Sequence, residues 1–422
     1  MLPFPALFRL SGGALLVALA VLPGMAHATD GYLINGMGAK ARGAGGVAIA
    51  MPEDALAIAA NPAAATELGH RADLGVEFFM PRRGARIEGN MAGLDGRHSG
   101  NGVSTFVLPE VGYVRPLSDR VAVGIAINGN GGMNTTYKRN PFASFGATGK
   151  AGVDLKQVFI TPTVAVRVVE GHSLGVSPII MAQSFEARGI QPFAGASSDP
   201  ARFSNRGTGL STGFGLRVGY LGTVVEGVRV GAFYQTKVWE GRFKRYSGLF
   251  ADKGSFDVPA SWGVGISVKP DASLTLGADF KRIEYSEVES VGNPLAPLFV
   301  GVPFGAPGGP GFGWRDISVI KVGGAWQASE KLTLRAGYGH AQNPVRASQT
   351  FLNILAPGVV KDHFTAGATA KLASGLEVTG YAMHAPRKTV RGQASIPANF
   401  GGGEADVHLS ETALGLSLGV EF

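Results

Sequence analysis

Cysteine is the first absence in this sequence of 422 residues, which contains none. Without cysteine the chain has neither a disulfide framework nor a thiolate metal site. Charged residues are also scarce, at 16%, where a soluble domain has about 25%. The formal net charge is only +7 and no long basic run is present, so we expect no nucleic-acid partner.

Long apolar runs are absent beyond the N-terminus. The run from Gly12 to Leu22 covers about eleven residues, too few for a bilayer span, which takes about 20. Arg9 precedes this run and Ala26-His27-Ala28 follows it, which is the pattern of a secretory signal peptide cleaved near Thr29. We therefore predict a signal peptide over residues 1–28, no transmembrane helix after it, and only β-strands for any membrane span.

The end of the chain, ALGLSLGVEF, alternates with a period of two residues. Leu414, Leu416, Leu418, Val420 and Phe422 share one face of an extended strand, and small or polar residues share the other. In a soluble sheet the apolar face would pack on a core. In an outer-membrane barrel it faces lipid, and the small or polar face lines the lumen.

The same alternation recurs from residue 71 onward. We count about fourteen such segments, an even number, as in bacterial single-chain barrels. Their lengths of roughly 8–17 residues suit tilted membrane strands, which need about 9–11. The segments lie near residues 71–80, 103–115, 121–128, 156–169, 172–186, 207–221, 226–242, 257–269, 272–285, 316–327, 330–341, 361–372, 375–390 and 407–422.

Short and long connections alternate strictly between these segments, as periplasmic turns and outer loops do in outer-membrane barrels. A soluble β-sandwich has no reason for this alternation. The sequence therefore predicts an all-β membrane protein, with a 14-stranded antiparallel transmembrane barrel over residues 71–422. Residues 29–70 do not alternate, and we expect them to form a compact segment with one or two short helices. The long links cover about 81–102, 129–155, 187–206, 243–256, 286–315, 342–360 and 391–406.

Scattered charged residues fall on the lumen-facing side of the predicted strands. One interpretation is a solvated lumen with internal ion pairs. The other is that one or two cations hold a ligand carboxylate, because arginine offers that group a bidentate fork. The cations that parity places inward are Arg167, Arg217, Arg229, Lys237, Lys281 and Arg335, and the carboxylates are Asp73, Glu77 and Asp279.

Motifs for catalysis or cofactor binding are not evident. GMGAKARGAGG (Gly36 to Gly46) lacks the strand and helix of a nucleotide-binding βαβ unit, and GATGK (Gly146 to Lys150) has the wrong spacing for a phosphate loop. The eight histidines are dispersed. We predict no enzyme activity, no catalytic residues, no cofactor and no metal, with a barrel lipase or acyltransferase as a minor alternative.

Four features of the chain resemble the FadL/TodX (OMPP1) family of outer-membrane transporters for long-chain fatty acids and other hydrophobic compounds. The Gly-rich opening DGYLINGMGAKARGAGGVAIA is similar to the start of that family, and Asn61-Pro62-Ala63 matches its NPA motif. The segment from Gly313 to Val345 resembles its Trp-Arg-Asp and Leu-Arg-Ala-Gly-Tyr hairpin. The fourth feature is the alternating last strand with terminal Phe422.

This resemblance implies a fourteen-stranded barrel plugged by an N-terminal hatch over residues 29–70. It implies passive uptake, with ligand captured by outer loops and released sideways through a gap in the barrel wall. The gap would lie at a kink in the third strand, where Gly129, Gly131 and Gly132 follow the expected end at Asn128. These glycines could instead begin the second outer loop.

The long loops carry apolar residues that form a candidate ligand groove or, alternatively, pack together to cap the barrel. We expect a hydrophobic small-molecule ligand, contact with outer-membrane lipid and lipopolysaccharide, recognition of Phe422 by the barrel-assembly machinery, and a monomer in the outer membrane of a Gram-negative bacterium. A general diffusion porin and a surface adhesin remain alternatives. The groove candidates are Phe142, Phe145, Phe193, Phe203, Leu298 and Phe299, with Phe304 and Phe312 beside them; the lumen candidates for a ligand carboxylate are Arg167, Arg217, Lys237 and Arg335.

Overall fold

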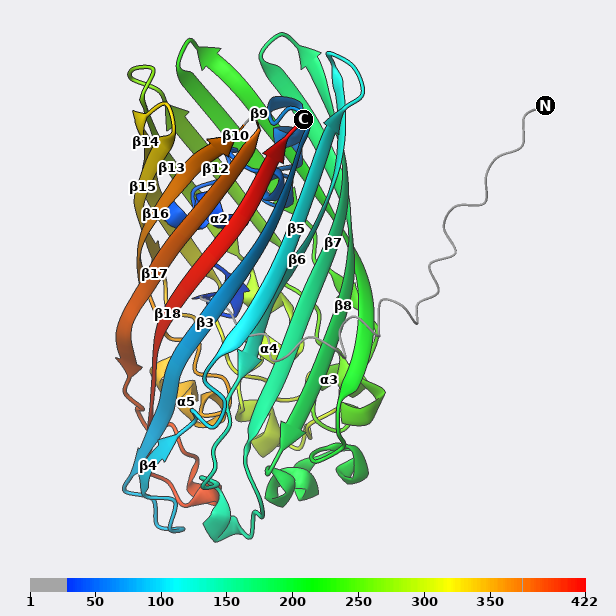
Figure 1. The fold of residues 1–422 in the computed structure, drawn as a ribbon. Helices are drawn as coiled ribbons and strands as arrows, with labels where there is room; N and C mark the ends of the chain where they lie inside the picture. The colour runs from blue at the N-terminus through cyan, green and yellow to red at the C-terminus, as the bar shows by residue number, and fades with distance from the viewer. Residues whose placement is uncertain (1–28, 374) are drawn as a thin grey trace, which may run out of the picture.

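A computed structural model describes residues 29–373 and 375–422, so the predicted signal peptide lies outside the described residues. One antiparallel sheet closes on itself as a barrel, because β18 (Glu404–Glu421) pairs along its length with β3 (Arg71–Glu88) (Figure 1). Of the eighteen strands in this sheet, four are very short and fourteen form the wall. The predicted fold class and number of wall strands are confirmed.

The wall strands run in chain order around the barrel. They are β3 and β18 with β5 (Phe106–Pro116), β6 (Val121–Asn134), β7 (Gly152–Val169), β8 (His172–Arg188), β9 (Gly209–Val225), β10 (Val228–Gln235), β12 (Ser261–Val268), β13 (Leu274–Ile283), β14 (Ile317–Ser329), β15 (Leu332–Ala341), β16 (Asp362–Ala373) and β17 (Leu376–Val390).

Short elements occupy the N-terminal segment and the long loops. None of the helices in the described part of the chain combines the length and the apolar character needed to cross a bilayer. The short strands are β1 (Thr29–Asp30), β2 (Leu33–Ile34), β4 (Gly96–Ser99) and β11 (Trp239–Glu240); the α-helices are α2 (Ala39–Gly43), α3 (Ala251–Gly254), α4 (Glu289–Gly292) and α5 (Thr350–Asn353). The 3-10 turns are η1 (Ala55–Ala59), η2 (Pro62–Glu67), η3 (Ala143–Phe145), η4 (Gln191–Ala196), η5 (Pro200–Arg202), η6 (Lys244–Tyr246), η7 (Tyr285–Glu287), η8 (Ala296–Val300), η9 (Ala347–Gln349) and η10 (Ala398–Phe400).

The outer face of the wall carries the apolar half of each alternating strand. On β18, Leu414, Leu416 and Leu418 are each about half exposed, whereas the intervening Ala413 and Ser417 are buried. The neighbouring β3 presents Leu74 and Phe78 outward in the same way. This arrangement suits a bilayer, because the apolar side chains on the outer face contact the hydrocarbon of the lipid.

Several strands end at places that the sequence pattern did not predict. The first strand, β3, continues to Glu88, and β6 continues past Asn128 to Asn134. On β3 the apolar alternation fades because the outward positions Arg82 and Arg86 are charged and lie above the lipid-facing belt. On β6 glycines and a shift of register between Gly129 and Gly131 interrupt the alternation. In the other direction, β10 ends at Gln235, so the expected strand over 226–242 was wrong at its end and Lys237 lies between β10 and β11.

The N-terminal segment, residues 29–70, lies inside the barrel (Figure 1, blue). Its helix α2 packs against β16 and β17, η1 packs against β5 and β6, and η2 packs against β7 and β8. The sequence predicted one or two short helices here, and the structure contains one helix and two 3-10 turns. The long-loop end of the barrel is at the bottom of Figure 1, and the C-terminus is at the opposite end.

Glycines on the inner wall allow this segment to approach the strand backbone directly. A Cβ atom added to Gly219 of β9 would lie 2.1 Å from the side-chain oxygen of Asn61. A Cβ atom added to Gly131 of β6 would lie 2.2 Å from the carbonyl oxygen of Tyr32. Part of the large glycine content of the chain is therefore explained by the seating of the N-terminal segment.

We predict that the cost of a charge on the outer face depends on depth. Leu416→Arg should lower the free energy of unfolding by about 2–4 kcal/mol, because it places a guanidinium in the middle of the lipid-facing belt. Thr412→Arg, on the same face of β18 at the edge of the belt and opposite Met80, should cost about 0–1 kcal/mol. Urea titration of both variants folded in lipid vesicles measures the difference, and equal costs would contradict the assigned belt.

Candidate functional site

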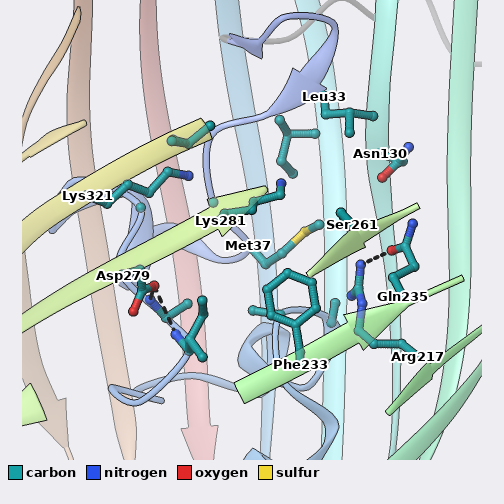
Figure 2. A pocket seen from close by; sticks show the side chains of 18 residues that line it. Leu33, Met37, Asn130, Arg217, Phe233, Gln235, Ser261, Asp279, Lys281 and Lys321 are labelled. Atoms are coloured by element: carbon teal, nitrogen blue, oxygen red, sulfur yellow. Dashed lines mark hydrogen bonds between the residues drawn. The ribbon is translucent and has the colours of Figure 1, made fainter. Parts of the chain in front are cut away.

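The N-terminal segment and the inner wall enclose a cavity of about 60 Å³, which we call the interior cavity. Figure 2 shows residues of the N-terminal segment, among them Leu33 and Met37, reaching the same space as the wall residues. The lining mixes apolar and charged side chains. It consists of Leu33, Ile34, Gly36, Met37, Gly46, Ala48, Ile49, Ala59, Ala60, Asn130, Arg217, Phe233, Gln235, Ser261, Asp279, Lys281, Val319 and Lys321.

Arg217 on β9 is a cavity-lining residue that forms no salt bridge to a carboxylate within residues 29–373 and 375–422. Its side chain is buried, and its Nη2 donates a hydrogen bond to Oε1 of Gln235. The guanidinium carbon lies 5.7 Å from the centre of the Phe233 ring. Among the described residues, Nε and Nη1 of Arg217 have no hydrogen-bond partner. A buried guanidinium with two unsatisfied donors is costly unless an anion completes the site.

The other charges of the cavity are partly neutralised by the N-terminal segment. Lys321 forms a salt bridge to Asp30 at 3.2 Å. Asp279 accepts hydrogen bonds from the backbone N–H groups of Ala48 at 2.8 Å and Ile49 at 3.1 Å. Lys281 has no salt-bridge partner in the described part of the chain. Because three cations face two carboxylates, the interior cavity has an excess of positive charge.

The remaining carboxylate-binding candidates from the sequence are paired with protein carboxylates. Arg335 is held by both oxygens of Glu53, at 2.7 and 3.0 Å. Arg167 contacts Glu67 at 3.2 Å. Lys237 lies 3.5 Å from Asp257 in the loop after β10. Arg217 therefore differs from the other three candidates, because each of those forms a salt bridge with a protein carboxylate.

Asn61 of the NPA motif is fully buried and connects the N-terminal segment to the wall. Its Nδ2 donates to the carbonyl oxygens of Ile49 and Tyr220, each at 2.8 Å. Its Oδ1 accepts from the N–H of Ala63 at 3.1 Å, which caps η2, with Pro62 as the first residue of that turn. The Asn61 side chain thus forms hydrogen bonds with two parts of the N-terminal segment and with the wall strand β9.

Ion pairs hold α2 against an acidic part of the inner wall. Arg42 contacts Glu110 at 2.9 Å and Glu77 at 3.4 Å, and its Nη1 donates to the Tyr381 hydroxyl at 3.1 Å. Lys40 contacts Glu377. Since the five charged side chains among these are buried, each charge depends on its partner.

The long loops close over a second cavity of about 50 Å³, the loop pocket, in which half of the lining residues are phenylalanines. Phe142 and Phe193 meet edge to face with ring centres 5.1 Å apart. Phe203 and Phe304 are 5.5 Å apart. The lining is Phe142, Val153, Phe185, Ile190, Phe193, Phe203, Leu249, Phe250, Ser290, Phe304, Pro310, Gly311, Phe312, Phe351, Leu352 and Leu355.

The predicted loop residues thus both pack together and line a pocket. Phe145 and Leu298 pack against the same cluster, and Phe299 lies at its edge, 6.3 Å from Phe400. Phe351, whose ring is 6.0 Å from that of Phe142, was not among the residues predicted from the sequence. The apolar run FLNIL within a long connection was the available signal.

Four aromatic side chains, which we call the aromatic barrier, lie beside the N-terminal strand between the two cavities. They are Tyr32, Phe256, Tyr285 and Trp314, and the ring of Tyr32 is 5.4 to 6.1 Å from the other three. The Tyr285 hydroxyl donates to the carbonyl oxygen of Asp30 at 2.5 Å. Burial raises the pKa of this hydroxyl above its ordinary value, so it remains a donor.

The glycines of the third wall strand lie inside β6, where the hydrogen-bond ladder to β5 stops. The last β5–β6 pair is Val111 with Ile127. Beyond it β6 continues to pair with β7, with a shift of register between Gly129 and Gly131. We call this unpaired edge of β6 the ladder break. Inside the barrel, β2 of the N-terminal segment pairs with this part of β6, through Leu33 and Gly131.

Arg83 spans the outer margin of the ladder break. Its Nε donates to the carbonyl oxygen of Asn134 at 2.7 Å, and its Nη2 donates to the Asn134 side chain at 2.5 Å and to the carbonyl oxygen of Val103 at 2.9 Å. Its guanidinium carbon lies 5.6 Å from the centre of the Phe106 ring. Arg83 therefore ties β3 to β6 where β5 does not reach.

Phe422 at the C-terminus is exposed at the short-turn end of the barrel. Its N–H donates to the carbonyl oxygen of His70 at 3.0 Å, and its ring lies 4.6 Å from the His70 ring. The end of β18 thus contacts His70, the residue that precedes the first wall strand, β3.

Comparison with known proteins places these features in a family. A family model described as outer membrane protein transport protein (OMPP1/FadL/TodX) matches residues 25–422. Outer membrane protein P1 of Haemophilus influenzae is 25% identical over 321 residues, which cover 67% of this chain and 66%, just under two thirds, of that protein.

Solved structures with the same fold include a FadL homologue of Pseudomonas aeruginosa, with a TM-score of 0.70, 18% identity, and coverage of 93% of this chain and 100% of that one. The toluene transporter TodX of P. putida has a TM-score of 0.67 and 17% identity, with 92% and 99% coverage. The toluene transporter TbuX of Ralstonia pickettii has a TM-score of 0.64 and 19% identity, with 92% and 99% coverage. At these identities the likeness concerns the fold.

We predict that Asn61→Ala loosens the N-terminal segment while the barrel stays folded. The substitution removes three buried hydrogen bonds, each worth about 1 kcal/mol net. Hydrogen exchange at residues 49–65 should become at least about tenfold faster, because local opening no longer breaks these bonds.

Asn399→Ala, at an exposed position in an outer loop, is the matched control and should leave the exchange unchanged. The heat-dependent mobility of the barrel in gels verifies folding of both variants. Unchanged exchange in Asn61→Ala would show that Asn61 does not hold the segment.

Proposed function

This chain belongs to the outer membrane protein transport protein (OMPP1/FadL/TodX) family, and we propose that it carries long-chain fatty acids passively across the outer membrane. The resemblance noted from the sequence is thereby confirmed at the level of the family, which is one of transport proteins and not of enzymes. The observation that carries the proposed substrate is Arg217, a buried cation without a carboxylate partner in a largely apolar cavity.

Arg217 matches the head group of a fatty acid. Either of its Nε and Nη1 donors, which have no partner among the described residues, can donate a charge-assisted hydrogen bond to a carboxylate oxygen. Lys281 adds a second cation to the same cavity. Leu33, Met37 and Phe233 supply the apolar surface that the adjoining methylene groups require.

The loop pocket fits the capture step. An acyl chain gains about 0.8 kcal/mol for each CH₂ that leaves water, and the phenylalanines of the loops offer that apolar surface. The loop pocket and the interior cavity hold only about 50 and 60 Å³, whereas ligand sites usually measure about 300–1,000 Å³. The structure therefore corresponds to a closed state, and passage requires the N-terminal segment to shift.

We assign the role of hatch to residues 29–70. The segment continues directly into β3 at Arg71, and Asn61 and the ion pairs of Arg42 hold the rest of it against the wall by noncovalent contacts. The aromatic barrier lies at its tip, where Tyr32 adjoins the loops. A hatch in this position makes a general diffusion porin the weaker alternative, because such a porin has a water-filled lumen.

We assign the exit to the ladder break. The unpaired edge of β6 offers a path from the interior to lipid that avoids water, and the backbone of Tyr32 and Leu33 lies against Gly131 at this edge. A hollow lined by Gly31, Phe79, Gly132 and Met133, among others, lies at this point inside the wall. Movement of residues 30–33 would uncover the path.

A monoaromatic hydrocarbon is the second candidate substrate. The phenylalanine-rich loop pocket favours it, since aromatic rings pack well against one another. The P. putida and R. pickettii proteins of this fold are toluene transporters. A hydrocarbon has no anionic group for Arg217 to bind. Substitution of Arg217 should therefore affect transport of a fatty acid and not transport of a hydrocarbon.

The remaining partners follow from the location in the outer membrane. We propose that Phe422 is the residue read by the barrel-assembly machinery, because it ends the last strand and stays exposed. We further propose that the protein acts as a monomer, since the wall closes within one chain.

We predict that Arg217→Met weakens oleate binding and uptake by about 10- to 100-fold, because a hydrogen bond to a charged group contributes about 1.5–3 kcal/mol. Arg217→Lys should retain part of the activity. Toluene uptake should not change in either variant.

Arg120→Met, in an exposed short turn, is the matched control. Binding measured by calorimetry in detergent and uptake measured in cells provide the two readouts. Equal loss of oleate and toluene uptake would indicate damage to the path, and full oleate binding by Arg217→Met would exclude the proposed head-group site.

We predict that Gly131→Ala displaces the N-terminal strand from β6 and changes the rate of uptake, because the new methyl group cannot share space with the Tyr32 carbonyl oxygen. Gly339→Ala is the matched control, since its Cβ would lie 3.5 Å from its nearest neighbour, an ordinary contact. Hydrogen exchange at Leu33 and oleate uptake check the effect, and wild-type values for Gly131→Ala would remove the ladder break from the transport path.

A further inference from the structure

Arginines gather on the outer face of the wall at the long-loop end of β17, β18 and β3, beside β4. Arg82 and Arg86 belong to β3, Arg97 to β4 and Arg387 to β17, and Arg391 follows the end of β17. Together with neighbouring polar residues, most of them border a groove of about 800 Å³. This groove, which we call the arginine groove, is far larger than the interior cavity and the loop pocket, and the proposed transport path does not use it.

The arginine groove begins just above the lipid-facing belt. Below it, β18 presents Leu414, Leu416 and Leu418 outward, and β3 presents Phe78. Met80 of β3 pairs with Thr412 of β18, and this row is the last before the charged positions.

The next outward position on β3 is Arg82, which pairs with Ser410. Arg86 follows about 13 Å further along the strand at about 3.3 Å per residue. The guanidinium groups therefore cover the depth at which lipid head groups lie above the hydrocarbon core.

Most of these charges have no partner in the protein. Arg82, Arg97, Arg387 and Arg391 form no salt bridge within residues 29–373 and 375–422. Arg86 contacts Glu88 on its own strand. Arg86 and Arg97 are also direct cross-strand partners, an arrangement of like charges that destabilises a sheet. Asp406 of β18 lies opposite Arg86 on its other side.

The carboxylates of the groove do not neutralise this cluster. Glu88 is engaged by Arg86, and Asp406 accepts a hydrogen bond from the N–H of Gly392 at 2.9 Å. Glu404 pairs with Glu88 in the row furthest from the belt. Asp406 lies in the same row as Arg86, Glu404 lies in a row further from the membrane, and Arg82 lies nearer to it. The five arginines of the cluster outnumber the three carboxylates, Glu88, Glu404 and Asp406, so the surface keeps an excess of positive charge for an anionic ligand at the membrane surface.

We propose that the arginine groove binds the phosphorylated head group of an outer-leaflet glycolipid, with its acyl chains against Phe78 and Leu414. Guanidinium groups bind phosphate through paired, charge-assisted hydrogen bonds. One lipid molecule satisfies both halves of the surface, because its phosphates meet the arginines while its chains cover the apolar belt. The site is independent of the transported substrate.

The experiment compares binding of lipid A with two phosphates to wild type and to Arg86→Gln/Arg97→Gln/Arg391→Gln, by native mass spectrometry in detergent with EDTA present. The triple variant should bind at least about tenfold more weakly, because three charge-assisted contacts are lost. The control variant Arg202→Gln/Arg206→Gln/Arg346→Gln, at exposed loop positions, should bind like wild type. Heat-dependent gel mobility verifies that all three proteins are folded.

Two further measurements test the site with the wild-type protein alone. Lipid A from which both phosphates have been removed should bind much more weakly than the phosphorylated form. Inorganic phosphate alone should compete only weakly. Equal binding of the two lipid forms, equal binding by the triple variant, or inorganic phosphate binding as tightly as lipid A would each overturn the proposed glycolipid site.

Discussion

The pairing of buried charge is the constraint on which this structure depends. A barrel that faces lipid must place its polar residues inside, and here the N-terminal segment fills that interior, so the wall charges lose most of their water. Glu77, Glu110 and Glu377 on the wall are matched by Arg42 and Lys40 of α2. Because an unpaired buried charge is far more costly than a paired one, these contacts fix where the segment sits.

The same constraint makes the exceptions informative. Arg217 is a buried cation whose donors are satisfied on one side by Gln235 and not on the other. On the outside, the arginine groove carries unmatched guanidinium groups at the level of lipid head groups. In both places the protein supplies cations and leaves room for an anion, which is why one is proposed to bind a transported carboxylate and the other a membrane phosphate.

The proposed transport path and its closure share the first residues of the N-terminal segment. Tyr32 contributes to the aromatic barrier, and its carbonyl oxygen accepts from Gly132 at the ladder break, at 3.0 Å. Leu33 lines the interior cavity and pairs with Gly131. In the proposed mechanism, a single shift of this strand opens the loop side, the cavity and the wall together.

The sequence by itself determined the number of wall strands, their outward faces and the enrichment of phenylalanine in the loops, because each follows from local alternation and composition. It did not determine strand ends, since β3 continues to Glu88 where outward positions turn polar. Nor did it distinguish Arg217 from Arg335, because both point inward by parity. Only the tertiary structure decided that Glu53 neutralises Arg335 while Arg217 stays unmatched, because these partners are far apart in the chain and meet only when the segment is seated in the barrel.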